Sequence, residues 1–298
     1  MFFLNLAPFN FRNVLGALGP VEKIEVVSYR DALKEMTYEA LVYLKPHYKN
    51  AREKSGIYGK CDGSGTDRSE VVAIRKGVAE AIERWAFYSL NAEKKHRAGL
   101  NVDPTSTGFA ALPCFPRRAA RRFALIEAVE RWAITNWWNG RLPARVVDFS
   151  TQFDTWAINT PFKDISVRIT SQSCNDDLGQ TFFVYGFSAG NNGTHATRKA
   201  IVEMDRNRRA ILISGKGDIS KLLPSSVSDQ RILFFSGQSG RKIFLDKIND
   251  QFEVALIGEP KLMVDTEVVG HWSQYCTVWR CLLENTETDI VSPKYFLF

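Results

Sequence analysis

The chain has 298 residues and a formal net charge of +6, with 45% hydrophobic and 24% charged residues. This is the ordinary balance of a globular protein, and no apolar run approaches the roughly 20 residues that span a bilayer, which excludes a membrane-spanning helix. The five cysteines are odd in number and form no Cys-x-x-Cys pair. This disfavours a zinc site or a disulfide framework and favours a reducing, cytoplasmic location.

The apolar pattern predicts three long helices. The helices run from about Asp67, as N-cap, to about Lys95, from 117 to 138, and from 194 or 197 onward. In the first helix, apolar residues recur every three or four positions, at Val71, Ile74, Val78, Ile82 and Trp85. Stretches rich in β-branched and aromatic residues predict strands at 23–29, 165–171, 181–187, 231–235, 252–257 and 261–264.

Strands interspersed with helices indicate a mixed α/β or α+β architecture, and we expect an α+β fold with mixed sheets and packed helices. We expect one domain over 1–298, with an N-terminal segment at 1–58, a core at 59–214 and a strand-rich closing segment at 215–298. The positive charge suits an anionic ligand. It is a weak indication of nucleic acid, because much of it lies in two clusters, at 117–122 and 206–209.

A heptapeptide occurs twice, as EAIERWA at 80–86 and EAVERWA at 127–133, with six of seven positions identical. In each copy two glutamates stand three residues apart and are neighbours on one helix face. They are Glu80 and Glu83 in the first copy and Glu127 and Glu130 in the second. If the two helices pack together, the four carboxylates need a counter-charge, and a hard divalent cation such as Mg²⁺ supplies it with oxygen ligands.

Arg84 and Arg131 follow directly after the glutamate pairs. A guanidinium at this place suits bidentate contact with a phosphate, or it orients a glutamate. Glu-x-x-Glu-Arg on a single helix is more often a solvated face. The duplication, which includes an uncommon Trp at both copies, favours a functional interpretation, with Trp85 and Trp132 directed toward a core.

Three stretches together resemble the signatures of the YcaO family. They are GSGTDRSEVVAIRKGVAEAIERWAF, STGFAALPCFPRRAARRFALIEAVERWAITNWW and VYGFSAGNNGTHATRKAIVEMDRNRR, in the family's order and over most of residues 59–209. The resemblance implies a fold that binds ATP and Mg²⁺ without a P-loop, and the chain has no Gly-x-x-x-x-Gly-Lys-Ser/Thr motif. It implies that Glu80, Glu83, Glu127 and Glu130 are Mg²⁺ ligands.

The same resemblance implies further nucleotide contacts. Arg131 would contact phosphate and Arg208 would reach the nucleotide, with Glu203 as its companion on the helix; surface ion pairing is the alternative for the last two. Lys76 stands where the family has a Ser and could meet a phosphate or lie on the surface. The stretch LPCFPRRAA lacks the Asn and Glu that the family places after the second turn, and SPKYFLF lacks the Pro-rich tail of azoline-forming members.

The resemblance also implies the reaction. The family uses ATP to activate a backbone amide of a ribosomally made precursor peptide. A cyclodehydratase that forms azolines is the leading expectation. A thioamide- or amidine-forming enzyme and a catalytically degenerate assembly subunit remain alternatives. We expect a partner that binds the leader peptide, of an ubiquitin-activating-like (ocin-ThiF-like) or TfuA-like kind, with a homodimer as a further option.

Two other features have open interpretations. The stretch GFSAGNNG at 186–193 is either a phosphate cradle or a plain flexible turn. Trp137 and Trp138 are expected in the core, with a substrate-facing role as the alternative. The four histidines lie far from any matching Ser or Cys motif, which disfavours a Ser-His-Asp or Cys-His enzyme.

Overall fold

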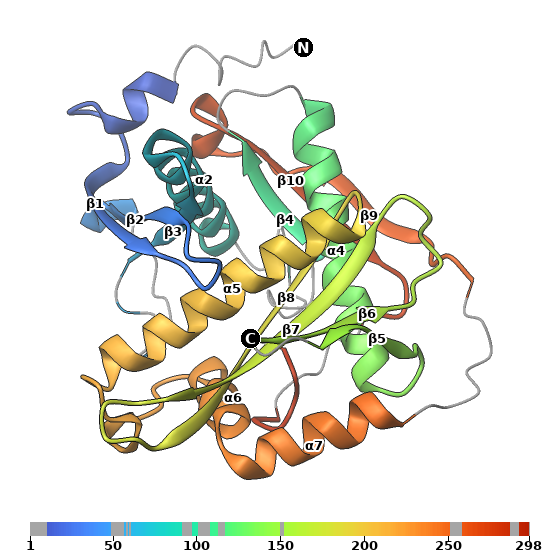
Figure 1. Cartoon of the computed structure of the whole chain (residues 1–298). Helices are drawn as coiled ribbons and strands as arrows, with labels where there is room; N and C mark the ends of the chain where they lie inside the picture. The colour runs from blue at the N-terminus through green and yellow to red at the C-terminus, as the bar shows by residue number, and fades with distance from the viewer. Residues whose placement is uncertain are drawn as a thin grey trace. The chain divides into compact units, whose positions relative to one another are not determined.

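The computed structural model describes residues 11–48, 57, 59, 61–90, 97–100, 108–112, 117–149, 152–250, 258–286 and 292–297. Within these residues the chain contains five α-helices and ten strands in three antiparallel sheets (Figure 1). The fold is α+β, as the sequence predicts. Two compact units form: Met1–Arg52, Lys60–Ala128 and Leu262–Leu282 make the first, and Glu53–Gly59, Val129–Lys261 and Leu283–Phe298 make the second.

The first unit contains a sheet in the order β1 (Val21–Arg30), β2 (Met36–Leu44), β3 (Gly63–Asp67), covered by helix α2 (Glu70–Ser89). Helix and sheet approach closely because glycines line the contact. A Cβ added at Gly65 would lie 2.2 Å from the carbonyl oxygen of Ala73. The N-cap of α2 is Ser69 and not the predicted Asp67, whose carboxylate instead accepts the Ser69 N–H at 3.0 Å.

A second sheet of the first unit has the order β4 (Gly108–Leu112), β10 (Thr277–Leu283), β9 (Leu262–Glu267). Helix α4 (Arg117–Trp138) begins in this unit and is joined to β9 by ion pairs. The core around α2 is formed by buried apolar side chains, among them Val42, Leu44, Val78, Ile82, Trp85, Trp272 and Val278.

The second unit is built on the sheet β5 (Ala144–Phe149), β6 (Asp154–Ile158), β7 (Ser166–Asn175), β8 (Thr181–Gly190). Helix α5 (Gly193–Ser214) packs on β7 and β8, while α6 (Val227–Ser236) and α7 (Gln238–Asn249) contact β8. Because side chains alternate along a strand, Gly186 faces α5 and its neighbour Tyr185 faces α6 and α7.

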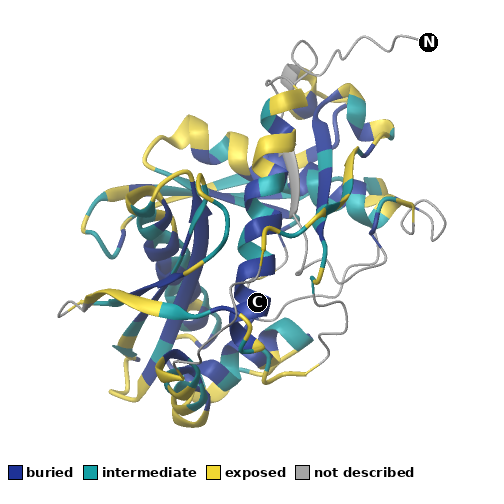
Figure 2. Ribbon diagram, turned by 90° about the vertical axis from the view of Figure 1, so that its right-hand side faces the viewer, coloured by how far each residue is buried: buried dark blue, intermediate teal, exposed yellow. Residues whose placement is uncertain are grey.

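An aromatic cluster forms the core on the α6 and α7 side of this sheet. Phe296, near the C-terminus, is completely buried there and stacks on Trp138 with ring centroids 5.6 Å apart. Phe235, Phe244 and Tyr185 also contact Phe296. Trp137 and Trp138 are therefore core residues, as predicted, and Figure 2 shows the buried parts of the helices and strands in dark blue.

The predicted strands 23–29, 165–171, 181–187 and 261–264 are confirmed as parts of β1, β7, β8 and β9. The predicted strand at 231–235 is wrong, because these residues belong to helix α6, whose first turn is capped by the hydroxyl of Ser226 on the Asp229 N–H. The segment after 215 therefore begins with helices α6 and α7. The predicted strand at 252–257 lies outside the described residues.

Four short 3-10 helices complete the described elements: Phe11–Leu15, Pro46–Tyr48, Ile219–Lys221 and His271–Gln274. No helix among the described residues combines the length and the apolar character needed to cross a membrane.

Candidate functional site

The two heptapeptides lie on helices, as predicted, the first on α2 and the second on α4. Their tryptophans are buried: Trp85 is 7% exposed and Trp132 is 1% exposed. The Glu pairs therefore lie on faces that are fixed by the packing of the tryptophans. Val71, by contrast, is 57% exposed, so the buried face of α2 begins at Ala73 and not at Val71.

Glu80 is held by strand β3. Its Oε2 accepts hydrogen bonds from the backbone N–H of Ser64 at 2.6 Å and from the Ser64 hydroxyl at 3.2 Å. Its Oε1 pairs with Arg84 one turn further along α2, and Arg84 also donates to the carbonyl oxygen of Asp62 at 3.3 Å. Arg84 thus orients a glutamate, which is one of the two roles that the sequence left open for it.

Glu83 and Glu127 act electrostatically on a residue that the sequence did not single out. Arg280, on β10, is completely buried and donates from Nη2 to the carbonyl oxygen of Gly99 at 2.8 Å. Burial lowers the pKa of Arg280 to about 10, and the negative charges of Glu127 and Glu83 act in the opposite direction. The sequence did carry a signal for Arg280, because it is a charged residue within the apolar strand TVWRCLL. A buried charge of this kind is retained only when it is paired.

Glu130 lies in the second unit and is held by the edge of strand β8. Its Oε2 accepts the backbone N–H of Ala189 at 2.6 Å, while the carbonyl oxygen of the same residue accepts from Lys199 at 3.1 Å. Burial raises the pKa of Glu130, whereas Lys199, Arg131 and the Ala189 N–H favour its charged form. Neither Lys199 nor the backbone of Ala189 was recognisable as a partner from sequence spacing.

Arg131 follows Glu130, and its guanidinium carbon lies 5.9 Å from the ring centroid of Phe187 on β8. This distance is within the range of a cation–π contact. The ring therefore restricts where the guanidinium lies.

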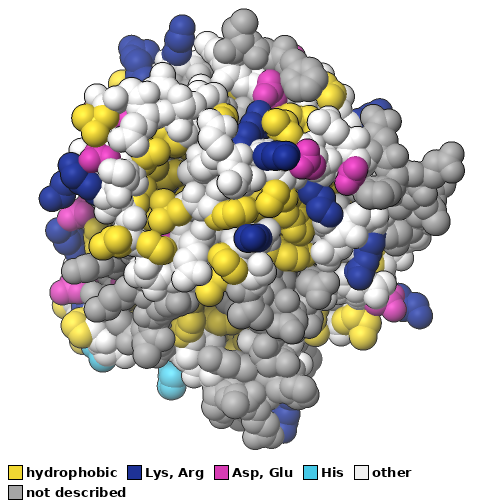
Figure 3. Space-filling model, turned by 90° about the horizontal axis from the view of Figure 1, so that it is seen from below, with side chains coloured by type: hydrophobic (Ala, Val, Ile, Leu, Met, Phe, Trp, Pro, Cys, Tyr) yellow, Lys and Arg dark blue, Asp and Glu magenta, His cyan; other side chains and the backbone are white. Residues whose placement is uncertain are grey.

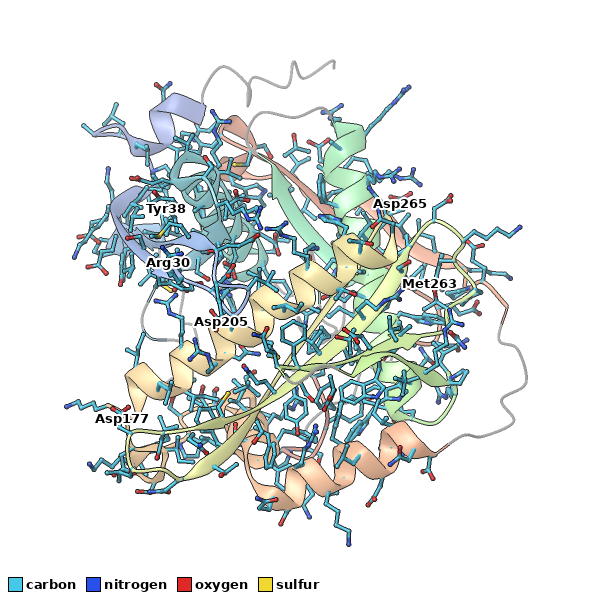
Figure 4. The ribbon with its side chains drawn as sticks, viewed as in Figure 1. Arg30, Tyr38, Asp177, Asp205, Met263 and Asp265 are labelled. Atoms are coloured by element: carbon cyan, nitrogen blue, oxygen red, sulfur yellow. The ribbon has the colours of Figure 1, made fainter. Side chains whose placement is uncertain are left out.

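The third predicted contact region is helix α5. Arg208 donates from Nε to Oδ1 of Asp205 at 2.9 Å, and Asp205 is completely buried (labelled in Figure 4). Glu203 pairs with Arg206 at 3.0 Å. The structure therefore gives Glu203 and Arg208 different partners on the same helix, and Arg208 is already engaged by a buried carboxylate.

Lys76 donates to Oδ2 of Asp67 at 2.7 Å and to the carbonyl oxygen of Thr66 at 3.1 Å. Its ammonium group is thus paired with the turn that precedes α2. This is the surface interaction that the sequence left open beside phosphate contact.

The stretch 186–193 is mostly strand. Residues through Gly190 pair with β7 in register, which contradicts a flexible turn over the whole stretch. Small residues are required here because a Cβ at Gly186 would lie 2.1 Å from the carbonyl oxygen of Ala200 on α5. Asn192 caps α5 by accepting the His195 N–H at 2.8 Å.

Four arginines of the two basic clusters pair with acidic residues. Besides the pairs on α5, Arg117 pairs with Glu267 at 2.7 Å, and Arg121 holds both oxygens of Asp265 (labelled in Figure 4). On the face drawn in Figure 3, some Lys and Arg side chains lie near Asp and Glu and others stand apart from them.

The chemistry of the four glutamates fits Mg²⁺, whose ligands are oxygen atoms. A carboxylate has about four lone-pair sites, so a bond to one backbone N–H leaves capacity for a metal, and such bonds orient metal ligands in general. Glu80 and Glu130 each accept such a hydrogen bond from a backbone N–H, that of Ser64 and that of Ala189. Across the described part of the chain, however, no three His, Cys, Asp or Glu side chains gather closely enough to hold a metal ion.

Neither a protein-family model nor a curated protein matches the sequence. Solved structures do match the fold. YcaO from Methanopyrus kandleri, bound with AMPPCP and Mg²⁺, superposes with a TM-score of 0.55 at 13% identity and covers 98% of this chain and 94% of that one. The chain has the YcaO fold.

Two further matches come from the E. coli microcin synthetase McbBCD complex. One superposes with a TM-score of 0.55 at 11% identity over 90% of this chain and 88% of that one. The other, from the complex with pro-MccB17 bound, has a TM-score of 0.53 at 10% identity over 87% and 86%. The resemblance seen in the three sequence motifs is thus matched by the fold across nearly the whole chain.

Proposed function

We propose that this chain is an ATP- and Mg²⁺-dependent enzyme of the YcaO type that activates a backbone amide of a peptide, with azoline formation by cyclodehydration as its leading reaction. The observation that carries the proposal is that each heptapeptide has one glutamate fixed by a strand N–H, Glu80 by Ser64 and Glu130 by Ala189. A carboxylate fixed in this way suits a ligand site, because catalysis of phosphoryl transfer depends on charged groups held in position.

In the proposed reaction the γ-phosphoryl group of ATP is transferred to the amide oxygen and ADP leaves. A Cys, Ser or Thr side chain attacks the amide carbon and loses its proton. Departure of inorganic phosphate together with loss of the amide N–H proton then leaves the C=N bond of an azoline. Glu80, Glu83, Glu127 and Glu130 would hold Mg²⁺, which neutralises phosphate charge when bound. Arg131 would contact a phosphate oxygen, because its guanidinium is restricted by Phe187.

Arg84, Lys76 and Arg208 have supporting roles in this proposal. Arg84 orients Glu80, and Lys76 fixes the turn before α2 through Asp67. Arg208 would reach a nucleotide only with the part of its guanidinium that Asp205 does not engage. Glu203 stays paired with Arg206.

The partners proposed are a precursor peptide and a protein that binds its leader. The microcin synthetase match is a complex, and one of its structures holds pro-MccB17. That assembly supports a multiprotein arrangement for this chain as well.

Calorimetry with ATP and Mg²⁺ tests the proposal. The wild-type chain should bind ATP, and Glu80→Gln combined with Glu130→Gln should weaken binding by at least about tenfold, since each change removes a full charge from the site. Glu25→Gln is the matched control, because Glu25 pairs with Lys23 and Tyr43 on β1 and β2. Absence of ATP binding by the wild-type chain would sink the proposal.

The reaction type needs a second measurement. With the partner and a Cys-, Ser- and Thr-rich precursor, mass spectrometry should show the loss of one water for each azoline formed. Exchange of oxygen for sulfur would instead identify a thioamide-forming enzyme, and replacement of oxygen by nitrogen an amidine-forming enzyme.

A non-catalytic assembly subunit is the second candidate. It is favoured by the engaged state of the cationic residues, since Arg84, Lys76 and Arg208 all have acidic partners within the chain. This candidate predicts stable association with the partner protein together with no ATP binding.

A further inference from the structure

Two arginines of the second unit lie in one row of its sheet. Arg145 on β5 pairs in register with Ala157 on β6, and Ala157 pairs with Arg168 on β7. Directly paired residues point to the same face of a sheet, so both arginines lie on one face, two strands or about 9–10 Å apart. This is the face on which α5 packs, because the Arg168 guanidinium lies against Gly193, the first residue of that helix.

The surroundings of Arg168 disfavour a positive charge. Its Nη1 donates to the carbonyl oxygen of Val167 at 3.0 Å, and its Nε is buried and makes no hydrogen bond within the described residues. The N-terminus of the 22-residue helix α5 adds partial positive charge beside the guanidinium. Burial lowers the pKa of Arg168, and the charge of Arg145 acts in the same direction.

No acidic side chain in the described part of the chain pairs with either arginine. The arginines of the second unit that do form ion pairs are Arg206, Arg208 and Arg241. Asp148 is paired with Thr155 one row further along the sheet, but it forms no ion pair with the two arginines. A partly buried guanidinium without a counter-charge is costly, and a bound anion removes that cost.

We propose that Arg145, Arg168 and the first turn of α5 form a phosphate-binding site. A guanidinium holds two phosphate oxygens through parallel N–H bonds. Asn192 caps the helix and leaves the backbone N–H groups of Gly193 and Thr194 for another oxygen. A phosphate group carries about 1.5–2 negative charges at pH 7 and so balances two guanidinium groups, whereas one carboxylate balances only one. The site does not rest on the proposed function, because it involves none of the four glutamates.

Gly193 allows the guanidinium to lie on the helix. A Cβ at this position would collide with Nη2 of Arg168 and would lie 3.2 Å from its Cζ. The obstructing atoms are the end of a flexible side chain and not backbone, so Gly193→Ala should fold and displace the guanidinium. This variant changes the position of Arg168 without changing the charge of the chain.

Calorimetric titration with inorganic phosphate, without metal and at constant ionic strength, tests the site. The wild-type chain should bind phosphate. Arg168→Met should weaken binding by at least about tenfold, because a charge-assisted bidentate contact is lost. Gly193→Ala should weaken it by about threefold or more although the charge is kept. Arg141→Met is the matched control: it removes one charge from the same unit, and Arg141 bonds to Asn136 instead.

A titration of the same variants with ATP and Mg²⁺ identifies the source of the phosphate group. Weaker ATP binding in both Arg168→Met and Gly193→Ala assigns the site to a phosphate of the nucleotide, whether or not the free ion binds. Weaker binding of inorganic phosphate alone assigns the site to the free ion. If both variants bind ATP and phosphate as Arg141→Met does, the site is refuted. If Arg168→Met does not fold, Gly193→Ala decides in the same way.

These outcomes separate the site from the proposed function. Phosphate binding that is lost in Arg168→Met supports the site even in a chain that does not bind ATP. ATP binding that depends on Glu80 and Glu130 supports the function even where the Arg168 and Gly193 variants bind every phosphate normally, a result that overturns the site alone.

Discussion

The ion pair between Arg208 and Asp205 can be used to test whether Arg208 stabilises the fold or contacts a nucleotide, because loss of either partner should have a different effect on stability. Arg208 Nη2 lies 2.7 Å from Oδ1 of Asp205, and the two side chains differ in exposure, at 30% for Arg208 and 0% for Asp205. The second oxygen of Asp205 is buried without a hydrogen bond among the described residues. Loss of Arg208 would therefore leave a buried carboxylate uncompensated, whereas loss of Asp205 would leave a guanidinium that water can reach.

The expected magnitudes follow from this difference. Breaking a fully buried pair by removing one partner costs about 3–5 kcal/mol. Partial exposure of Arg208 reduces the cost, so we expect about 2–3 kcal/mol for Arg208→Met. Asp205→Asn should cost about 1 kcal/mol, since it removes one charge-assisted hydrogen bond and keeps the shape of the side chain.

Urea unfolding of both single variants and of the double variant measures these values, and the coupling between the two sites should be about 1–2 kcal/mol. A structural ion pair would be refuted if the two single variants lost equal free energy of unfolding. It would also be refuted if the double variant lost the sum of the two single losses. ATP titration of the same variants separates the two roles of Arg208. If Arg208→Met leaves stability unchanged but weakens ATP binding, the guanidinium serves the nucleotide and not the fold.

Three further predictions concern packing and thiol chemistry. Gly65→Ala should lower the free energy of unfolding by about 3 kcal/mol, because the added Cβ would clash with the backbone of α2. Gly258→Ala, whose Cβ would meet open space, should leave the free energy of unfolding unchanged in the same urea titration. Phe296→Ala should lower the free energy of unfolding by about 3–5 kcal/mol, because the ring is completely buried in the aromatic cluster. A decrease below about 1 kcal/mol, measured by tryptophan fluorescence during unfolding, would contradict that packing. Burial raises the pKa of Cys174 to about 11, so its alkylation by iodoacetamide should stay slow at neutral pH and accelerate as pH approaches that value; fast alkylation at neutral pH would show an accessible thiolate.

The strongly periodic helices were the most predictable part of the fold. The predicted helix 117–138 coincides with α4, because long apolar periodicity leaves little ambiguity. The five residues at 231–235 show the opposite case. Ile and Phe favour strands on average, but the Ser226 cap and burial of Ile232 and Phe235 place this stretch in helix α6. A short apolar run does not distinguish the two states.

Strand β3 was missed because its sequence, GSGTD, has low strand propensity. Its extended state depends on pairing with β2 and on the close approach of α2, for which Gly65 is small enough. Both causes lie far away in sequence. The same argument explains why part of the stretch 186–193 was taken for a turn, since its glycines serve the packing of α5.

For the candidate site, the sequence predicted which carboxylates share a helix face and that their tryptophans enter a core. It did not predict the partner of each carboxylate. Ser64 and Ala189 act through backbone N–H groups, which carry no residue-specific signal. Arg280 carries such a signal, but its position relative to Glu83 and Glu127 depends on the pairing of β10 with β4.

The partners of the four glutamates also constrain the order of ligand binding. Arg84 pairs with Glu80. Lys199 and the Ala189 N–H favour the charged form of Glu130, and the charges of Glu83 and Glu127 act on Arg280. A divalent cation that arrives alone adds positive charge to carboxylates that already have cationic neighbours, and it gains little. A cation that arrives on the phosphates of a nucleotide brings its own negative charge, so the same residues oppose it less. Under the proposed function, the charges of these residues therefore favour joint binding of nucleotide and metal over binding of the metal first.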